Sequence, residues 1–324
     1  MTLAMPAEWA PHERCVVAWP ARADMWRDRF DEAKATHAAV VNAIGRFEPV
    51  LLVADPGAGD EAAAACPDAE VVEWPIDDSW ARDIGAIVLT DGGRRVGLNP
   101  VFNSWGEKFL PYDEDARFAE RMCEHLGLER LDAFPFVLEG GAITVDGAGT
   151  VITTEQCLLN PNRNPSLDRA GIEAELRRWL GVERVVWLRH GLVEDDDTDG
   201  HVDNVALCVR PGVVLAQTVA DPDDVNHARL RENVEVLSDA GYEVIEIDVL
   251  PTVEIDGESA RVPPLNTYLA DGAAIVPVVE GPEGDAALDQ LRAALPDREV
   301  VGVDGSVLAY GGGGIHCITQ QVPR

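Results

Sequence analysis

Lysine is nearly absent from this 324-residue sequence, and basic residues of any kind are scarce beside acidic ones. Lysine occurs only at positions 34 and 108, and 26 Lys and Arg residues stand against 58 Asp and Glu, for a formal net charge of −32. Nucleic acids and anionic membrane surfaces repel a chain of this charge. We therefore expect no nucleic-acid and no membrane partner, whereas a small cationic substrate suits the charge.

The sequence also lacks a membrane-spanning run, a signal peptide and paired cysteines. No stretch approaches the ~18 uninterrupted apolar residues of a membrane span, and the opening MTLAMPAEWAPHER has no signal-peptide pattern. The six cysteines are scattered without a CxxC pair, which is typical of reduced thiols. We expect a cytoplasmic protein in which most cysteines are plain core residues.

Motifs for metals and nucleotides are missing as well. There is no HExxH, no closely spaced cysteine ligand pair and no GxGxxG. The GGGG of residues 311–314 lacks the lysine of a phosphate-binding loop. The sequence therefore predicts neither a metal nor a cofactor.

Apolar patterning, in contrast, is abundant, since 46% of the residues are hydrophobic. Helical spacing of apolar residues occurs in five segments: 30–47, 114–127, 167–180, 224–240 and 284–295. Ten β-rich runs lie around them: VLLVA, AEVVEW, AIVL, GTVITT, RVVWL, VALCV, GVVLA, YEVIEI, AAIVPVV and EVVGV. Strands that alternate with helices predict an α/β protein, and no low-complexity linker divides residues 1–324 into separate domains.

Polar residues in unusual contexts recur at a regular interval. Asp83, which we place at a strand edge, is 56 residues before Glu139; Glu139 is 62 before His201, and His201 is 116, or two steps of 58, before Cys317. This interval predicts five repeated units that each send a polar position to a common centre. The fifth slot falls near PPLNTYLADG, where no residue stands out.

His201 and Asp203 are two residues apart in HVDNVALCV. If this segment is a strand, both side chains lie on one face, and the carboxylate orients the imidazole and raises its pKa. The alternative is a solvated acidic turn in which His201 is an ordinary turn residue.

Cys317 follows four glycines in AYGGGGIHCITQQVPR, which reads as a tight turn leading into a short strand. A cysteine nucleophile needs a base or a positive neighbour. On a strand the adjacent His316 would point to the opposite face, so we expect His201 to be the partner of Cys317. An inert buried thiol is the alternative.

Asp83 and Glu139 also have two interpretations. Arg82 and Asp83 could form a local ion pair, and Glu139 could cap the turn made by Gly140 and Gly141. Alternatively, the two carboxylates accept paired N–H bonds from a guanidinium group. One cysteine, one histidine and several carboxylates suit a planar, cationic substrate whose carbon is open to attack, with His201 as the acid and base.

Several longer motifs resemble agmatine deiminases, within the wider family that includes bacterial peptidylarginine deiminases. The matching segments run through the whole chain: 5–20 (MPAEWAPHERCVVAWP), 77–85 (DDSWARDIG), 102–113 (FNSWGEKFLPYD), 138–165 (LEGGAITVDGAGTVITTEQCLLNPNRNP), 196–206 (DDTDGHVDNVA) and 311–323 (GGGGIHCITQQVP). The resemblance implies a five-bladed α/β propeller (pentein) of pseudo-repeated ββαβ modules. It also implies conversion of agmatine and water to N-carbamoylputrescine and ammonia through an amidino-cysteine intermediate.

The resemblance also implies a role for each site residue. Cys317 resembles the nucleophile and His201 the general acid and base, whereas Asp83, Glu139 and Asp203 resemble the carboxylates that hold the guanidinium.

For the rest of the substrate, the resemblance implies contact between Asp197 and its far ammonium. Trp80 and Trp105 could wall the cation, or they are plain core residues. Two positions depart from the family pattern: Ala86 replaces the usual proline and Gly314 the usual asparagine. Either change could alter a loop that selects the guanidine substrate.

Two rival functions remain open. The first is deimination of peptidyl-arginine, arginine or a methylated arginine, although the acidic run 194–199 disfavours the α-carboxylate of free arginine. The second is a non-catalytic propeller that only binds a partner, which would have no need of the thiol. A homo-oligomer is compatible with either.

Overall fold

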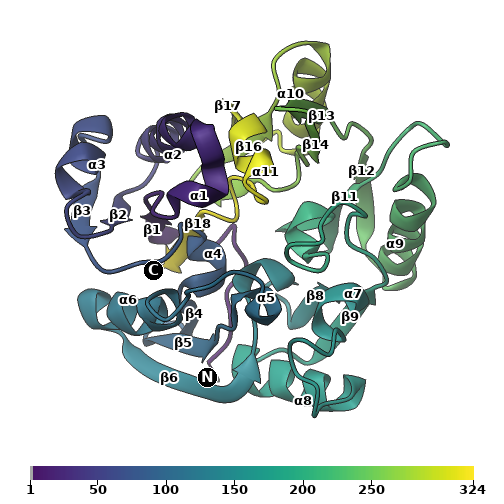
Figure 1. Cartoon of the computed structure of the whole chain (residues 1–324). Helices are drawn as coiled ribbons and strands as arrows, with labels where there is room; N and C mark the ends of the chain where they lie inside the picture. The colour runs from purple at the N-terminus through teal and green to yellow at the C-terminus, as the bar shows by residue number, and fades with distance from the viewer. Residues whose placement is uncertain (1–2) are drawn as a thin grey trace.

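Antiparallel and parallel strand pairs alternate regularly along the chain. The computed structural model describes residues 3–324, and within them five sheets repeat one topology: the first strand is antiparallel to the second, and the second is parallel to the third. A helix connects the second strand to the third in each case. Figure 1 shows the five units around a common centre, with these helices on the outside. The predicted ββαβ modules are confirmed.

The first three modules contain the following elements. Module 1 comprises β18 (Thr319–Pro323), β1 (His12–Ala18), α2 (Phe30–Ile44) and β2 (Val50–Ala54), extended by α3 (Gly59–Ala65) and β3 (Glu70–Glu73). Module 2 comprises β4 (Ile87–Thr90), β5 (Arg95–Val101), α6 (Phe118–Leu126) and β6 (Glu129–Val137). Module 3 comprises β7 (Thr144–Val145), β8 (Thr150–Thr154), α8 (Arg169–Leu180) and β9 (Arg184–Leu188).

Two further modules and a hairpin complete the chain. Module 4 comprises β10 (Ala206–Arg210), β11 (Val213–Gln217), α9 (His227–Asp239) and β12 (Glu243–Ile247). Module 5 comprises β15 (Tyr268–Ala270), β16 (Ala273–Val278), α10 (Pro282–Ala294) and β17 (Glu299–Asp304). The hairpin β13 (Thr252–Ile255) and β14 (Glu258–Arg261) lies between them. The short helices are α1 (Ala23–Trp26), α4 (Ala81–Ile84), α5 (Ser104–Glu107), α7 (Glu155–Leu158) and α11 (Ser306–Tyr310).

The C-terminal strand joins the two ends of the chain. Strand β18 pairs antiparallel with β1, so that Thr319 lies opposite Val17 and Pro323 opposite His12. The short strand expected after the glycine turn is thus confirmed. Because this strand belongs to module 1, it carries the residues just before it to the centre of the molecule.

The ten β-rich runs and the five helical segments expected from the sequence all form. Two local expectations are wrong. The strand expected from His201 begins only at Ala206, since Val202–Asn204 forms a 3-10 turn. Asp83 is in the short helix α4 and not at a strand edge. In both places the chain turns to deliver polar side chains to the centre before the strand starts.

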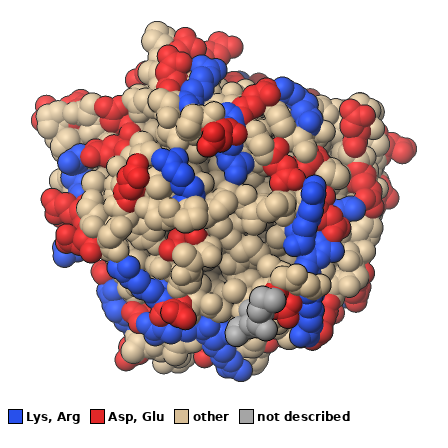
Figure 2. Space-filling view, turned by 180° about the vertical axis from the view of Figure 1, so that it is seen from behind, with Lys and Arg blue, Asp and Glu red and all other residues tan. Residues whose placement is uncertain are grey.

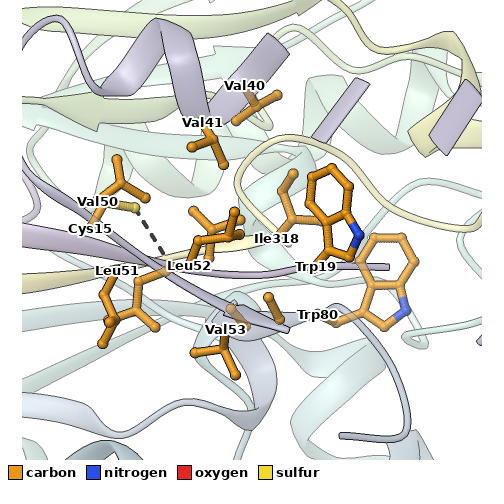
Figure 3. Close-up of a cluster of buried hydrophobic side chains, with 14 of the residues drawn as sticks. Cys15, Trp19, Val40, Val41, Val50, Leu51, Leu52, Val53, Trp80 and Ile318 are labelled. Carbon is orange, nitrogen blue, oxygen red and sulfur yellow. Dashed lines mark hydrogen bonds between the residues drawn. The ribbon is translucent and has the colours of Figure 1, made fainter. Parts of the chain in front are cut away.

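The largest hydrophobic cluster lies between α2 and the sheet of module 1 (Figure 3). Helix α2 buries Val40 and Val41 on the face that apolar spacing predicted. Every residue of β2 is buried, and Trp19 and Ile318 pack in the same cluster. Burial of one such side chain stabilises the fold by about 1.5–3 kcal/mol, so this cluster holds the segment next to Cys317 firmly.

Charged side chains of both signs share the molecular surface. On the face seen in Figure 2, they surround a centre with fewer charges. None of the helices formed by residues 3–324 is long and apolar enough to cross a membrane. All six cysteines are buried and have free thiols.

Candidate active site

One pocket brings together five of the residues singled out in the sequence. Its lining includes Trp80, Asp83, Trp105, Asp197 and Cys317. These residues come from distant segments of the chain, so the pocket exists only because the modules meet at a centre. Both tryptophans are buried and also face the pocket, so the two interpretations of their role are compatible.

The regular interval between the polar residues has a structural cause. Asp83 precedes β4, Glu139 precedes β7, His201 precedes β10 and Cys317 precedes β18. Each therefore lies where the chain enters the first strand of its module, and the modules direct these entries to one centre. In the fifth module the same place belongs to Asn266, just before β15. This is the slot for which the sequence offered no candidate.

The glycines before Cys317 allow the backbone to pack against aromatic rings. A Cβ at Gly311 would overlap Trp26, and one at Gly313 would overlap Trp80. Gly312 has a φ of +93°, which side-chain-bearing residues rarely adopt. The glycine run thus sets the position of Cys317 at the pocket wall.

Cys317 faces carboxylates and an amide. Its Sγ lies 3.9 Å from Oδ2 of Asp203 and 3.3 Å from Nδ2 of Asn266. Burial raises the pKa of the Cys317 thiol well above its ordinary value, and Asp203 and Asp83 raise it further. A cation placed between the thiol and these carboxylates would reverse this effect.

His201 is fully buried, and neither of its ring nitrogens has a hydrogen-bond partner among the described residues. Its Nδ1 lies 3.8 Å from Oδ2 of Asp83. Burial alone would lower the pKa of His201, but Asp83, Cys157 and Asp203 raise it well above its ordinary value. The side chain is therefore suited to carry a proton into the site.

The expected pairing of His201 with Asp203 is wrong. The argument assumed strand alternation, but the segment forms a 3-10 turn, and Oδ2 of Asp203 instead contacts Nδ1 of His316 at 2.8 Å. Nε2 of His316 contacts Oε2 of Glu8 at 2.9 Å. His316 therefore links two carboxylates, which raise its pKa against the opposing effects of burial and Arg82.

The strand argument also fails at Cys317, because β18 begins only at Thr319. His316 is consequently not excluded from the centre, since it holds the carboxylate beside the thiol. His201, in turn, makes no hydrogen bond to Cys317 in this structure. The partnership expected between His201 and Cys317 is therefore not a direct hydrogen bond.

Asp83 is held by two donors. Its Oδ2 accepts a hydrogen bond from Nε1 of Trp105 at 2.9 Å, and its Oδ1 accepts one from the Gly141 backbone at 2.9 Å. A Cβ at Gly141 would lie 2.5 Å from Nδ1 of His201 and 3.0 Å from Oδ2 of Asp203. Gly141 therefore allows these three side chains to converge.

Glu139 has an internal partner that the sequence argument missed. Oε1 of Glu139 accepts a 2.6 Å hydrogen bond from Nε of Arg163, and both side chains are fully buried. Oε2 of Glu139 has no partner among the described residues. The segment NPNRNP resembles a loop, and nothing local indicates that Arg163 points inward. One carboxylate oxygen thus remains for a ligand.

Two local alternatives for the carboxylates are wrong. Glu139 does not cap the turn that follows it. Arg82 does not pair with Asp83, since its guanidinium donates to the carbonyl of His316 and to Oε1 of Gln321. These contacts leave Asp83 facing the pocket.

Asp197 lies at the pocket rim, with its side chain exposed. Partial withdrawal from water and the neighbouring Asp195 raise its pKa, whereas Lys108 lowers it. Nζ of Lys108 donates to the Asp197 carbonyl at 3.0 Å and pairs with Asp199 at 2.9 Å. The Asp197 carboxylate is therefore available at the edge of the pocket.

Two groups of described residues bring possible metal-ligating atoms within 4.8 Å of one another: Glu139, Cys157 and His201, and separately His12, Glu48 and Asp271. In the first group, the Arg163 guanidinium already pairs with one oxygen of Glu139. In the second, the side chains are hydrogen-bonded to one another and to the backbone. Cys157 is the unexpected member, since its sequence context indicates no role beyond the core.

Comparisons with known proteins show which proteins this chain resembles. A family model described as Porphyromonas-type peptidyl-arginine deiminase matches residues 4–323. The agmatine deiminase of Stutzerimonas stutzeri is 41% identical, over 98% of this chain and 95% of its own.

Two solved structures are similar over nearly the whole chain. An agmatine deiminase of Enterococcus faecalis has a TM-score of 0.95 at 31% identity, covering 99% of this chain and 96% of that one. A C. jejuni agmatine deiminase with substrate bound has a TM-score of 0.92 at 27% identity, covering 100% and 97%. The resemblance seen in the sequence and the predicted fold are confirmed.

Proposed function

Because the chain belongs to the Porphyromonas-type peptidyl-arginine deiminase family, we propose that it hydrolyses agmatine to N-carbamoylputrescine and ammonia. The observation that carries this proposal is the buried thiol of Cys317 beside the carboxylates of Asp83 and Asp203. Buried carboxylates are costly unless a cation offsets them. A guanidinium group supplies that charge and also presents the carbon that the thiol attacks.

The open polar atoms suit a planar cation. Oε2 of Glu139 and Oδ1 of Asp203 are buried without a partner among the described residues, and each can accept an N–H of the guanidinium. Their other oxygens are fixed by Arg163 and His316. The two carboxylates are therefore oriented before the substrate arrives.

The chemistry then proceeds in two stages. The Cys317 thiolate attacks the guanidinium carbon and forms a C–S bond, and the His201 imidazolium gives its proton to a departing –NH₂ group. The C–N bond breaks, ammonia leaves and an amidino-cysteine remains. Neutral His201 then takes a proton from water, whose oxygen attacks the same carbon. The C–S bond breaks as the remaining hydroxyl proton is lost to the departing ammonia or to solvent, returning the thiolate and the His201 imidazolium and releasing the carbamoyl product.

Substrate charge also promotes formation of the thiolate. Burial, Asp203 and Asp83 hold the thiol protonated in the free enzyme by raising its pKa. A bound guanidinium offsets both carboxylates and so lowers the pKa of the thiol. Reactivity of Cys317 should therefore rise when a guanidine occupies the site.

The rim of the pocket favours an ammonium over a carboxylate at the far end of the substrate. Asp197 lies there, and the basic side chains nearby are engaged with acids: Lys108 with Asp199, and Arg261 with Glu194. The α-carboxylate of arginine would meet Asp197, and none of the described residues that line the pocket is basic. This arrangement supports agmatine over arginine.

The test is a panel of guanidines assayed for released ammonia. Agmatine, arginine, a peptidyl-arginine and methylated arginine are each incubated with purified protein, with Cys317→Ser as the blank. We expect agmatine to give the highest kcat/KM. Preference for an arginine derivative would overturn the assignment of substrate, and absence of ammonia from every guanidine would support the binding-protein alternative.

A further inference from the structure

Asn266 is a fully buried asparagine that reaches the nucleophile from module 5. Its Nδ2 lies 3.3 Å from Sγ of Cys317, and its Oδ1 lies 3.5 Å from the same sulfur. Neither the sequence motifs nor the proposed chemistry gave this residue a role. Its position before β15 is the same as that of Asp83 before β4, at the entrance to the first strand of a module.

Two other hydrogen bonds fix the orientation of the amide. Oδ1 of Asn266 accepts from the backbone N–H of His316 at 2.9 Å, and Nδ2 donates to Oδ1 of Asn204 at 2.9 Å. A flipped amide would place donor against donor and acceptor against acceptor. Since an amide –NH₂ carries two hydrogens, one is used by Asn204 and the second is directed at the sulfur.

The residue at position 314 makes room for this contact. A Cβ on Gly314 would overlap Oδ1 of Asn266 and lie 2.7 Å from its Cγ. The glycine that departs from the family pattern and the asparagine that contacts the sulfur are therefore sterically coupled. A side chain at 314 would therefore displace the amide.

The amide counteracts its surroundings. Burial, Asp203 and Asp83 disfavour a negative sulfur, whereas the Asn266 hydrogen bond and a backbone hydrogen bond from Gly314 favour it. An N–H directed at a thiolate is a charge-assisted hydrogen bond, which is stronger than one to a neutral thiol. The contact therefore gains strength as the sulfur becomes charged.

We propose that Asn266 is a positioning residue that fixes the Cys317 sulfur and stabilises its thiolate during turnover. This inference rests on the proposed function, because a thiolate matters only if Cys317 is the nucleophile. In the thiol form, S–H can donate to Oδ1; in the thiolate form, Nδ2–H donates to the sulfur. One amide thus serves both states without moving.

The test measures alkylation of Cys317 by iodoacetamide as a function of pH, without substrate, with Cys317→Ser as the background. In Asn266→Leu and Asn266→Asp we expect the alkylation midpoint to move to higher pH. The rate at neutral pH should fall about 10- to 100-fold, the range for a hydrogen bond to a charged group. We expect kcat for agmatine to fall similarly, with KM little changed.

The two variants at 266 together test the donor. A carboxylate keeps an acceptor for the His316 N–H but lacks the donor and adds a negative charge that itself raises the pKa of the thiol. Wild-type alkylation in Asn266→Asp would overturn the proposal. Leucine removes the donor without adding charge, so wild-type alkylation in Asn266→Leu would also overturn the proposal. The matched control is Asn233→Asp in α9, a buried asparagine bonded to the backbone of Arg189 and His190, which should leave alkylation unchanged.

A second variant keeps the test available if neither substitution at 266 folds. Gly314→Ala should displace the amide and lower the alkylation rate, as the Asn266 variants do. An unchanged pH profile of alkylation in Gly314→Ala would also overturn the proposal. Because alkylation needs no substrate, the outcome is independent of the guanidine panel. If the protein does not turn over agmatine but Asn266→Leu still moves the alkylation midpoint to higher pH, the proposed function is refuted. The contact between Asn266 and the Cys317 sulfur would still stand.

Discussion

Two buried histidines in this molecule have opposite surroundings. His12 contacts Glu48 through Nδ1 at 3.1 Å and the Glu8 carbonyl through Nε2 at 2.8 Å. Glu48 also accepts a 2.6 Å hydrogen bond from Tyr268, so this group joins module 1 to module 5. His201 is equally buried, yet neither ring nitrogen has a partner among the described residues.

This difference in hydrogen bonding distinguishes a structural histidine from a catalytic one. A buried polar group without a hydrogen bond costs free energy and is retained where a ligand supplies the missing partner. Among the described residues, no buried side-chain atom of His12 or Glu48 lacks a hydrogen-bond partner. Around His201, one oxygen of Glu139 and one of Asp203 also lack a partner. Residue types alone do not distinguish them, since both groups combine a histidine with carboxylates. Mutations should therefore affect turnover at one and stability at the other.

The largest effect is expected at the nucleophile. Cys317→Ser should abolish turnover, because a hydroxyl is a far weaker nucleophile at neutral pH, while the melting temperature stays close to wild type. Ammonia release and thermal unfolding measure the two properties. Cys208→Ser is the matched control, since Cys208 is buried, does not line the pocket and should alter stability only. More than a few per cent of residual activity in Cys317→Ser contradicts the assignment.

The second effect concerns the acid and base. His201→Asn should lower kcat at least ~10²-fold, as expected for lost acid–base catalysis. His316→Asn should lower it less but destabilise the protein more, because Glu8 and Asp203 lose their shared partner. Steady-state kinetics and unfolding on both variants give the comparison. A greater loss of kcat in His316→Asn would reverse the assigned roles.

The third effect tests the pocket rim. Asp197→Ala should lower kcat/KM for agmatine about 10- to 100-fold, toward the weaker end for a charge pair, because Asp197 is exposed before binding. A short alkylguanidine without the second amine should be little affected. Equal losses for both substrates would mean that Asp197 supports the fold or the guanidinium end instead.

The fourth effect is on the thiol. Asp203→Asn removes a negative charge 3.9 Å from Sγ of Cys317, which should lower the pKa of the thiol. More thiolate is then present below the wild-type alkylation midpoint, so alkylation at neutral pH should be about 10-fold faster although turnover falls. The pH dependence of alkylation without substrate checks this. Asp146→Asn, another buried aspartate that is bonded to Tyr242, should leave the profile unchanged.

Much of this arrangement follows from the sequence, and the rest depends on contacts between modules. Apolar periodicity and the interval from Asp83 to Cys317 predicted the elements and the common centre, because both are properties of single segments. The partner of Asp203 was misassigned because a 3-10 turn replaced the expected strand. Arg163 and Asn266 were missed, since no local pattern shows that a loop residue points inward to another module.

The smallest effect on turnover is expected at the His12 group. Glu48→Gln should leave kcat and KM unchanged, because this carboxylate contacts His12, Tyr268 and the Asp271 backbone and none of the pocket residues. It should lower the free energy of unfolding by about 1.5–3 kcal/mol, as for the loss of a charged hydrogen bond. Thermal unfolding and agmatine kinetics on the same preparation measure both properties.

Glu61→Gln is the control for this stability effect, because its ion pair with Lys34 is more exposed and should contribute ~1 kcal/mol or less. A loss of kcat in Glu48→Gln without a change in melting temperature would contradict the assignment of the His12 group to stability and the His201 group to catalysis. The group of His12, Glu48 and Tyr268 would then influence catalysis from the interface of modules 1 and 5. A buried histidine with all its hydrogen bonds made could no longer be assigned a purely structural role on that ground.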